Sequence, residues 1–160
     1  MENTRGYCCI GLDNAKNKIN IGCTLRAAGC YDVSMVAISG RRYGNNPTDT
    51  GKFYKHLPLL QVEDLKNVIP YNCIPVAVDI IEGAIPLPKY YHPERAFYIF
   101  GAEDQTLRNT VLAWCRDVVY IPTNYCMNLA ATVNVVLYDR MMKRWKEGER
   151  APSYRSFSND

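Results

Sequence analysis

Three short segments of the chain carry side chains that could bind anions, orient a substrate or assist proton transfer. In the first segment, Asn20 and Arg26 lie at and shortly after the expected start of a helix. Asn is a good helix cap, helix N-termini attract anions, and Arg binds phosphate through paired hydrogen bonds. Because such caps are common, the spacing alone favours a simple capped helix with an exposed Arg, and an anion site is the alternative.

The second segment, Phe100-Gly-Ala-Glu103, follows an apolar run that has the character of a buried strand. A glycine such as Gly101 lets a ligand approach the backbone closely. Glu103 could orient a substrate or accept a hydrogen bond from it. The alternative is an ordinary turn at the end of a strand, with Glu103 in solvent.

The third segment runs from Ile121-Pro122 through a short loop to Cys126-Met-Asn128, where an apolar helix begins. Asn128 suits the N-cap of that helix, which by itself would explain its presence. A nucleophilic Cys126 would need a base, and neither of the two histidines lies near it in the sequence. We therefore do not expect covalent catalysis by cysteine.

Basic residues gather in two places. Arg41 and Arg42 lie in a loop rich in Gly and Asn, where they have no obvious packing role, and we expect them to contact nucleic acid. The last helix carries Arg140, Lys143 and neighbouring cations. For these the pattern favours a solvated helix end whose positive charge complements the helix dipole.

Apolar segments with strand character alternate with amphipathic segments that have helical spacing. Strands are expected at residues 6–12, 32–38, 75–79, 96–100 and 117–121. Helices are expected at residues 20–30, 106–114 and 128–146, with a short one within 62–68. This alternation predicts an α/β fold with a mostly parallel sheet flanked by helices. Because ligands bind beyond the carboxyl ends of such strands, the segments after Asp79, Phe100 and Ile121 should meet at one edge.

The composition excludes several classes of protein. The chain has 160 residues and a net charge of +3, which suit one domain at 1–147 with a polar tail at 148–160. Seven cysteines without a C-x-x-C pair, and only two histidines, argue against a metal site. No apolar run approaches the roughly 20 residues of a membrane span, and the start lacks a signal-peptide core. We expect a cytoplasmic protein with reduced thiols and no membrane partner. The glycine fingerprints of nucleotide-dependent α/β enzymes are also missing, which disfavours that class.

In order and context, the three segments resemble the motifs of the SpoU/TrmH family of SPOUT RNA methyltransferases, over nearly the whole chain. The first motif has an Asn and an Arg separated by five residues, as in Asn20 and Arg26. The second motif has Phe/Leu-Gly-x-Glu followed by Gly-Leu, and here Thr106 stands in place of that Gly. The third has Ile-Pro and then Ser-Leu-Asn, and here Cys126 stands in place of that Ser.

The resemblance implies a trefoil knot in the C-terminal half and S-adenosylmethionine as cofactor, with S-adenosylhomocysteine as product. It also implies methyl transfer to a ribose 2′-hydroxyl of RNA, with tRNA favoured over rRNA, and a homodimer with the last helix at its interface. The apolar stripe of that helix is compatible with an interface, although packing within the chain would need the same stripe. It consists of Val133, Val136, Leu137 and Met141.

Roles for individual residues also follow only from the resemblance. Arg26 would act at the hydroxyl together with an RNA phosphate, Asn20 and Glu103 would hold the target nucleotide, and Asn128 would shape the pocket. The implied cofactor-binding residues are Val78, Asp79, Phe100, Gly101, Glu103, Ile121, Thr123, Cys126 and Met127. Because Thr106 and Cys126 depart from the motifs, a non-catalytic RNA-binding protein that keeps the knotted fold is the alternative.

Overall fold

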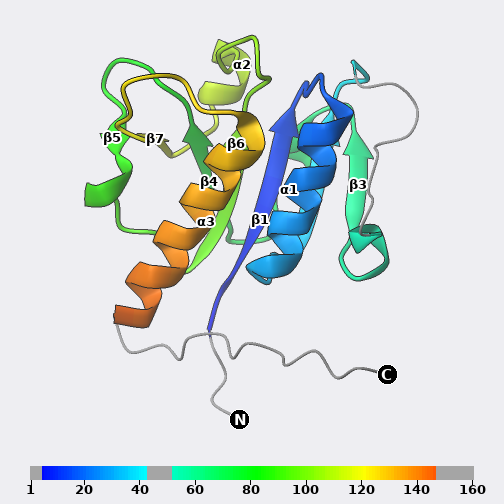
Figure 1. Cartoon of the computed structure of the whole chain (residues 1–160), viewed down its shortest axis with the longest axis horizontal. Helices are drawn as coiled ribbons and strands as arrows, with labels where there is room; N and C mark the ends of the chain where they lie inside the picture. The colour runs from blue at the N-terminus through cyan, green and yellow to red at the C-terminus, as the bar shows by residue number, and fades with distance from the viewer. Residues whose placement is uncertain (1–4, 43–51, 147–160) are drawn as a thin grey trace.

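A parallel sheet of seven strands forms the centre of the chain (Figure 1). The computed structural model describes residues 5–42 and 52–146, and within them the strand order is β3-β2-β1-β6-β4-β7-β5, with every pairing parallel. The strands are β1 (Tyr7–Asp13), β2 (Met35–Ser39), β3 (Leu59–Val62), β4 (Ile74–Val78), β5 (Ile85–Pro86), β6 (Arg95–Phe100) and β7 (Asp117–Tyr120). The predicted α/β fold with a parallel sheet is confirmed. The two edge strands, β3 and β5, were not predicted.

Helices cover both faces of this sheet. The α-helices are α1 (Lys18–Cys30), α2 (Asn109–Leu112) and α3 (Leu129–Lys146). The part of the chain that the structure describes also has three short 3-10 helices, η1 (Phe53–Lys55), η2 (Leu65–Val68) and η3 (Leu87–Lys89). Helices α1 and α3 lie side by side on one face (Figure 1), and η2 and α2 pack against the other.

Strand β6 shows why the central strands are apolar throughout. Tyr98 and Phe100 belong to the core beneath α1 and α3, whereas Phe97 and Ile99 belong to the core on the opposite face. Side chains alternate across a strand, so a strand that is covered on both faces must be apolar at every position. The continuous apolar runs in the sequence therefore mark the interior strands.

The start of α1 corrects one prediction. Asn17, not Asn20, is the N-cap, and its side-chain oxygen accepts a hydrogen bond from the backbone N–H of Ile19 at 2.8 Å. Asn20 lies inside the first turn and is buried. The apolar pattern missed the true start because the first two helical residues, Lys18 and Ile19, are exposed.

The helix expected at 106–114 is also shorter than predicted, since α2 comprises only Asn109–Leu112. The backbone N–H of Leu107 instead donates to the carboxylate of Asp79 at 2.7 Å. The segment before α2 is thus hydrogen-bonded to the loop after β4, and it does not continue the helix.

Other predictions have mixed outcomes. Helix α3 begins directly after Asn128, as expected, and all seven cysteines are free. Within the described residues, no helix is long and apolar enough to cross a membrane. The predicted boundary at residue 147 and the tail after it lie outside the described residues. The trefoil knot stays a prediction.

Candidate functional site

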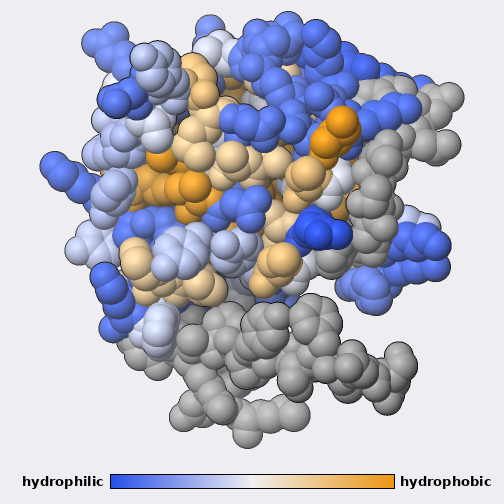
Figure 2. All heavy atoms as spheres, viewed as in Figure 1, coloured by the Kyte–Doolittle hydropathy of each residue, from blue (hydrophilic) through white to orange (hydrophobic). Residues whose placement is uncertain are grey.

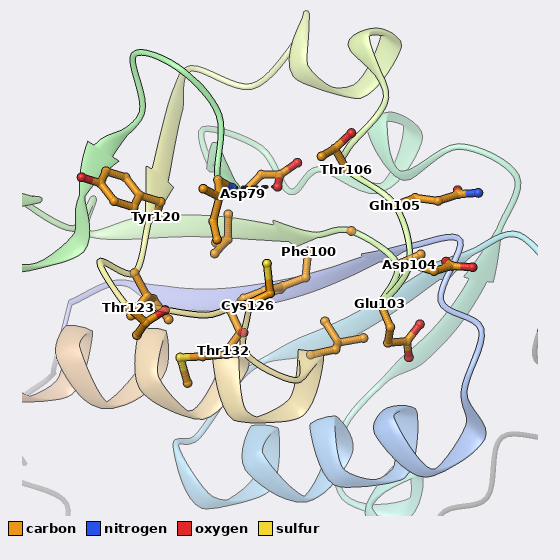
Figure 3. Close-up of a pocket in the computed structure, with 17 residues that line it drawn as sticks. Asp79, Phe100, Glu103, Asp104, Gln105, Thr106, Tyr120, Thr123, Cys126 and Thr132 are labelled. Carbon is orange, nitrogen blue, oxygen red and sulfur yellow. Dashed lines mark hydrogen bonds between the residues drawn. The ribbon is translucent and has the colours of Figure 1, made fainter.

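A cavity of about 470 Å³ opens at the carboxyl ends of β4, β6 and β7 (Figure 3). Its walls come from the loops that follow these three strands and from the first turn of α3. Parallel strands bring their carboxyl ends to one edge, which is where the sequence predicted that the segments would meet. All the residues expected to bind the cofactor line this cavity: Val78, Asp79, Phe100, Gly101, Glu103, Ile121, Thr123, Cys126 and Met127.

Further lining residues were not predicted. They are Ile80, Ala102, Asp104, Gln105, Thr106, Tyr120, Leu129 and Thr132. Most are chain neighbours of predicted residues, so taking each loop as a whole would have found them. Thr132 is different, because it reaches the cavity from the first turn of α3, where its hydroxyl donates to the backbone oxygen of Asn128 at 3.0 Å.

A chain of hydrogen bonds joins the three polar segments beside the cavity. The side-chain amide of Asn20 donates to Glu103 Oε1 at 2.8 Å, and the amide of Asn128 donates to Asn20 Oδ1 at 2.9 Å. These residues lie 83 and 108 positions apart in the sequence. The structure therefore brings Asn20, Glu103 and Asn128 together, although they come from α1, from the loop after β6 and from the start of α3.

Glu103 is the end of this chain that borders the cavity. Its carboxylate also accepts hydrogen bonds from the backbone N–H groups of Lys16 at 3.1 Å and Asn17 at 3.4 Å. Partial burial tends to raise the pKa of Glu103, but the hydrogen bonds from Asn20 and from backbone N–H groups outweigh it, so its pKa is lowered. The residue is therefore a carboxylate at neutral pH.

Asn128 both caps a helix and belongs to this chain of hydrogen bonds. Its side-chain oxygen accepts from the backbone N–H groups of Ala130 at 2.9 Å and Ala131 at 3.3 Å, while its amide donates to Asn20. The capping interpretation is correct, and the same side chain also fixes α3 relative to α1.

Asp79 connects two walls of the cavity. One carboxylate oxygen accepts from the backbone N–H of Ile80 and the other from that of Leu107, both at 2.7 Å. At Gly101, an added Cβ would lie 3.3 Å from the backbone oxygen of Gln105. The glycine thus allows the loop after β6 to fold back on itself, so that Leu107 can reach Asp79.

Arg26 is not brought to the cavity of its own chain. It lies on the exposed side of α1, because the inward side is occupied by Asn20, Ile21, Thr24 and Leu25. The cavity is lined by the three carboxylates of Asp79, Glu103 and Asp104, and no Lys, Arg or His is among its described lining residues. The described lining therefore offers no positively charged side chain to a phosphate.

The two arginines expected to contact RNA, Arg41 and Arg42, follow β2 and are both exposed. Arg42 forms an ion pair with Asp104 on the cavity wall. The two departures from the motifs, Thr106 and Cys126, both line the cavity (Figure 3). In the part of the chain that the structure describes, no group of His, Cys, Asp and Glu is arranged to hold a metal ion.

Comparisons with solved structures show the same fold. The SpoU methyltransferase AviRb from Streptomyces viridochromogenes, solved in complex with the cofactor AdoMet, has a TM-score of 0.78 at 18% identity, over 89% of this chain and 62% of AviRb. The A. aeolicus TrmH/SpoU tRNA modifying enzyme has a TM-score of 0.77 at 15% identity, over 91% of this chain and 80% of the enzyme. A structure described as "Structural insights into the 2-OH methylation of C/U34 on tRNA" has a TM-score of 0.76 at 18% identity, over 92% of this chain and 100% of the other.

The chain thus spans about three fifths of AviRb, at 62% of its length. No curated protein sequence matches it significantly. The model of the SpoU rRNA Methylase family matches residues 7–138, which include all three polar segments. The chain therefore belongs to the SpoU rRNA methylase family.

Proposed function

We propose that this chain is an S-adenosylmethionine-dependent RNA methyltransferase that acts on a ribose 2′-hydroxyl, with tRNA favoured over rRNA. The observation that carries the proposal is the hydrogen-bonded chain of Glu103, Asn20 and Asn128 beside the cavity, in a member of this family. The family's relatives include a protein solved with AdoMet and a structure described in terms of tRNA methylation, which supports the cofactor and the preferred substrate.

The cavity fits the proposed cofactor in size and chemistry. Its volume of about 470 Å³ lies in the usual range for small-molecule sites. Apolar side chains, among them Val78, Phe100 and Leu129, offer a surface for an adenine ring, and backbone groups of Ile121 and Met127 would hold its polar edge. The surrounding carboxylates match the positive charge of a sulfonium group.

When bound, S-adenosylmethionine would supply the methyl group: its S–CH3 bond would break as the C–O bond to the ribose forms, S-adenosylhomocysteine would leave, and the hydroxyl proton would pass to solvent. In our proposal Glu103 accepts a hydrogen bond from the target nucleotide, in a position fixed by Asn20. Asn128 shapes the pocket by holding the start of α3 against α1. Positioning and electrostatic stabilisation would supply most of the rate enhancement.

Arg26 does not line the cavity of its own chain, so a role in the reaction requires it to act at the cavity of another copy. We propose that it acts in a homodimer, where Arg26 of one copy binds an RNA phosphate near the cavity of the other. A cation and phosphate beside the ribose would favour loss of the hydroxyl proton.

The outward face of α1 and α3 suits such a dimer. Ile19, Tyr138 and Trp145 are exposed there by 69%, 52% and 58%, and Figure 2 shows apolar surface in the middle of this face. Contiguous exposed apolar surface marks protein interfaces. The predicted stripe is not the contact surface, because Val133, Val136 and Leu137 are buried within the chain and Met141 is partly buried.

The proposal is tested by incubating the protein with methyl-labelled S-adenosylmethionine and bulk RNA from a strain that lacks it. We expect label in a 2′-O-methylated nucleoside of tRNA. Label on a base would contradict the ribose assignment, and label confined to rRNA would contradict the tRNA preference. RNA binding without any affinity for S-adenosylhomocysteine, measured by calorimetry, would favour the non-catalytic alternative.

A further inference from the structure

Arg41 and Arg42 are neighbours in the sequence, but the structure gives them different surroundings. The Arg42 guanidinium donates two hydrogen bonds to Asp104, from Nη1 to Oδ1 at 3.1 Å and from Nη2 to Oδ2 at 2.7 Å. Nη1 also donates to the backbone oxygen of Asn14 at 3.4 Å. A two-pronged contact of this kind fixes orientation as well as distance. Arg41 is exposed.

The partner of Arg42 belongs to the wall of the cavity. Asp104 lies in the loop after β6 and lines the cavity next to Glu103. The ammonium group of Lys16 lies 3.7 Å from Asp104 Oδ2 and adds a second positive charge. Arg42 lowers the pKa of Asp104 through this hydrogen-bonded contact, so the pair stays ionised at neutral pH.

The backbone turn after β2 places Arg42 beside Asp104. Gly40 has a φ of +78°, and an added Cβ would lie only 2.6 Å from the side-chain oxygen of Asn14. The backbone N–H of Asn14 in turn donates to the oxygen of Ser39 at 3.1 Å. The turn is therefore packed against the β1–α1 connection, and Arg42 projects from a fixed base.

Three of the contacts that attach the loop after β6 bear on the cavity, and a further ion pair joins Arg108 of this loop to Asp13. Glu103 holds it to the β1–α1 connection, Leu107 holds it to Asp79, and Asp104 holds it to Arg42. Glu103 and Asp79, which form the first two contacts, are among the residues that the sequence predicts to bind the cofactor. Arg42, which forms the third, is one that it predicts to bind RNA.

We infer that Arg42 is a positioning residue that fixes the cofactor-cavity wall through Asp104, whereas Arg41 is the arginine left to contact RNA. The inference rests on the proposed function, since it assigns Arg42 to the cofactor side of that site. A free RNA-binding role for Arg42 would require it to exchange Asp104 for a phosphate.

The test measures S-adenosylhomocysteine affinity by calorimetry in the absence of RNA. We expect Arg42→Ala to weaken binding about threefold to fivefold, because part-exposed ion pairs contribute modestly. Arg42→Lys should restore only part of the affinity, because an ammonium group cannot match both carboxylate oxygens. Arg41→Ala is the matched control and should bind S-adenosylhomocysteine as the unmodified chain does, while raising the KM for RNA.

A double-mutant cycle separates positioning from direct contact. In an Asp104→Asn background, Arg42→Ala should cause no further loss of affinity, because the attachment is already broken. Equal S-adenosylhomocysteine affinity for Arg42→Ala and the unmodified chain would overturn the inference, as would additive losses in the cycle.

Amide hydrogen exchange distinguishes this inference from the proposed function itself. Arg42→Ala should speed exchange in residues 101–106, and Arg41→Ala should not. Faster exchange in Arg42→Ala, in a protein that binds no S-adenosylhomocysteine, would overturn the proposed function but support the positioning of the wall by Arg42. Unchanged exchange in residues 101–106 would overturn the inference even if the cofactor binds.

Discussion

Two polar networks lie at opposite ends of the sheet, and α3 contributes to both. At the carboxyl ends, Asn128 at the start of α3 connects through Asn20 to Glu103, whose side chain borders a cavity. At the amino ends, Arg140 is buried, and its guanidinium donates to the backbone oxygens of Pro93 and Glu94. The first network presents a carboxylate to an open space, whereas the second satisfies backbone oxygens inside the protein.

Histidine chemistry sharpens the contrast. His92 contacts Tyr98 at 2.6 Å and Asp139 at 2.8 Å, and Lys143 lies 2.6 Å from the same carboxylate of Asp139. Burial lowers the pKa of His92 to about 4, despite the opposing effect of Asp139. A hydrogen-bonded Asp, His and Tyr can resemble a catalytic site, but here the imidazole is enclosed. A polar cluster that a ligand can reach indicates a function. A cluster whose hydrogen-bonding groups are enclosed and already paired within the protein indicates a structural role.

The largest expected effect comes from breaking the amino-end network. Arg140→Met should lower the free energy of unfolding by about 3 to 4 kcal/mol, because it removes the charge-assisted hydrogen bonds that Arg140 donates to the oxygens of Pro93 and Glu94. Urea denaturation measures this. Arg116→Ala, which removes an exposed ion pair with Asp117, should cost less than about 1 kcal/mol. Equal losses for the two variants would show that the amino-end network is not structural.

The next effect concerns pH. The pKa of His92 is about 4 in the folded chain and about 6.5 when exposed, so protons favour the unfolded state. The contribution of His92 to the free energy of unfolding should be fully present above about pH 6.5. It should fall by about 3 kcal/mol as the pH drops to about 4. Urea denaturation across this range checks the prediction. His92→Gln should flatten the curve, and an unchanged slope in that variant would assign the pH dependence to other groups.

A smaller effect is expected at the other end of α3. Asn128→Ala should cost about 1 kcal/mol of stability, because the helix loses its N-cap. It should also weaken S-adenosylhomocysteine binding, because Asn20 loses its donor. Asn128→Ser restores a cap but cannot supply the amide, so it should recover stability without recovering affinity. If Asn128→Ser recovers both stability and S-adenosylhomocysteine affinity, then Asn128 acts only as a helix cap.

The smallest effect concerns a departure from the family motif at the cavity. Cys126→Ser should raise kcat for methyl transfer by at most about threefold, since a hydroxyl is a stronger hydrogen-bond partner than a thiol. Its urea midpoint should not change, because the Cys126 side chain is exposed. A loss of activity in this variant would mean that the thiol has a role of its own.

Much of the site could be predicted from the sequence because its residues follow strand ends. Asp79, Phe100 and Ile121 lie at or just after buried apolar runs, and parallel pairing brings such ends to one edge. The motif resemblance then placed Asn20, Glu103 and Asn128 in one site, and the structure joins their side chains. Local pattern and motif spacing were sufficient for these residues.

Contacts between distant segments could not be predicted in the same way. The pair of Arg42 with Asp104 spans 62 positions and depends on the turn at Gly40. Arg140 is expected from its charge to belong to a solvated basic helix end, because charge alone does not reveal that the backbone oxygens of Pro93 and Glu94 lie beside it. The edge strands β3 and β5 are short and partly exposed, so they leave little apolar pattern.

The most direct test of the account measures RNA methyl transfer and the urea midpoint on the same preparations of two variants, Glu103→Gln and Arg140→Met. We predict that Glu103→Gln loses about a hundredfold in kcat/KM while its midpoint falls less than that of Arg140→Met. Arg140→Met should lose stability while its folded fraction keeps kcat/KM within about threefold of the unmodified chain. Full activity in Glu103→Gln, or an equally inactive but folded Arg140→Met, would contradict the division between a functional and a structural end.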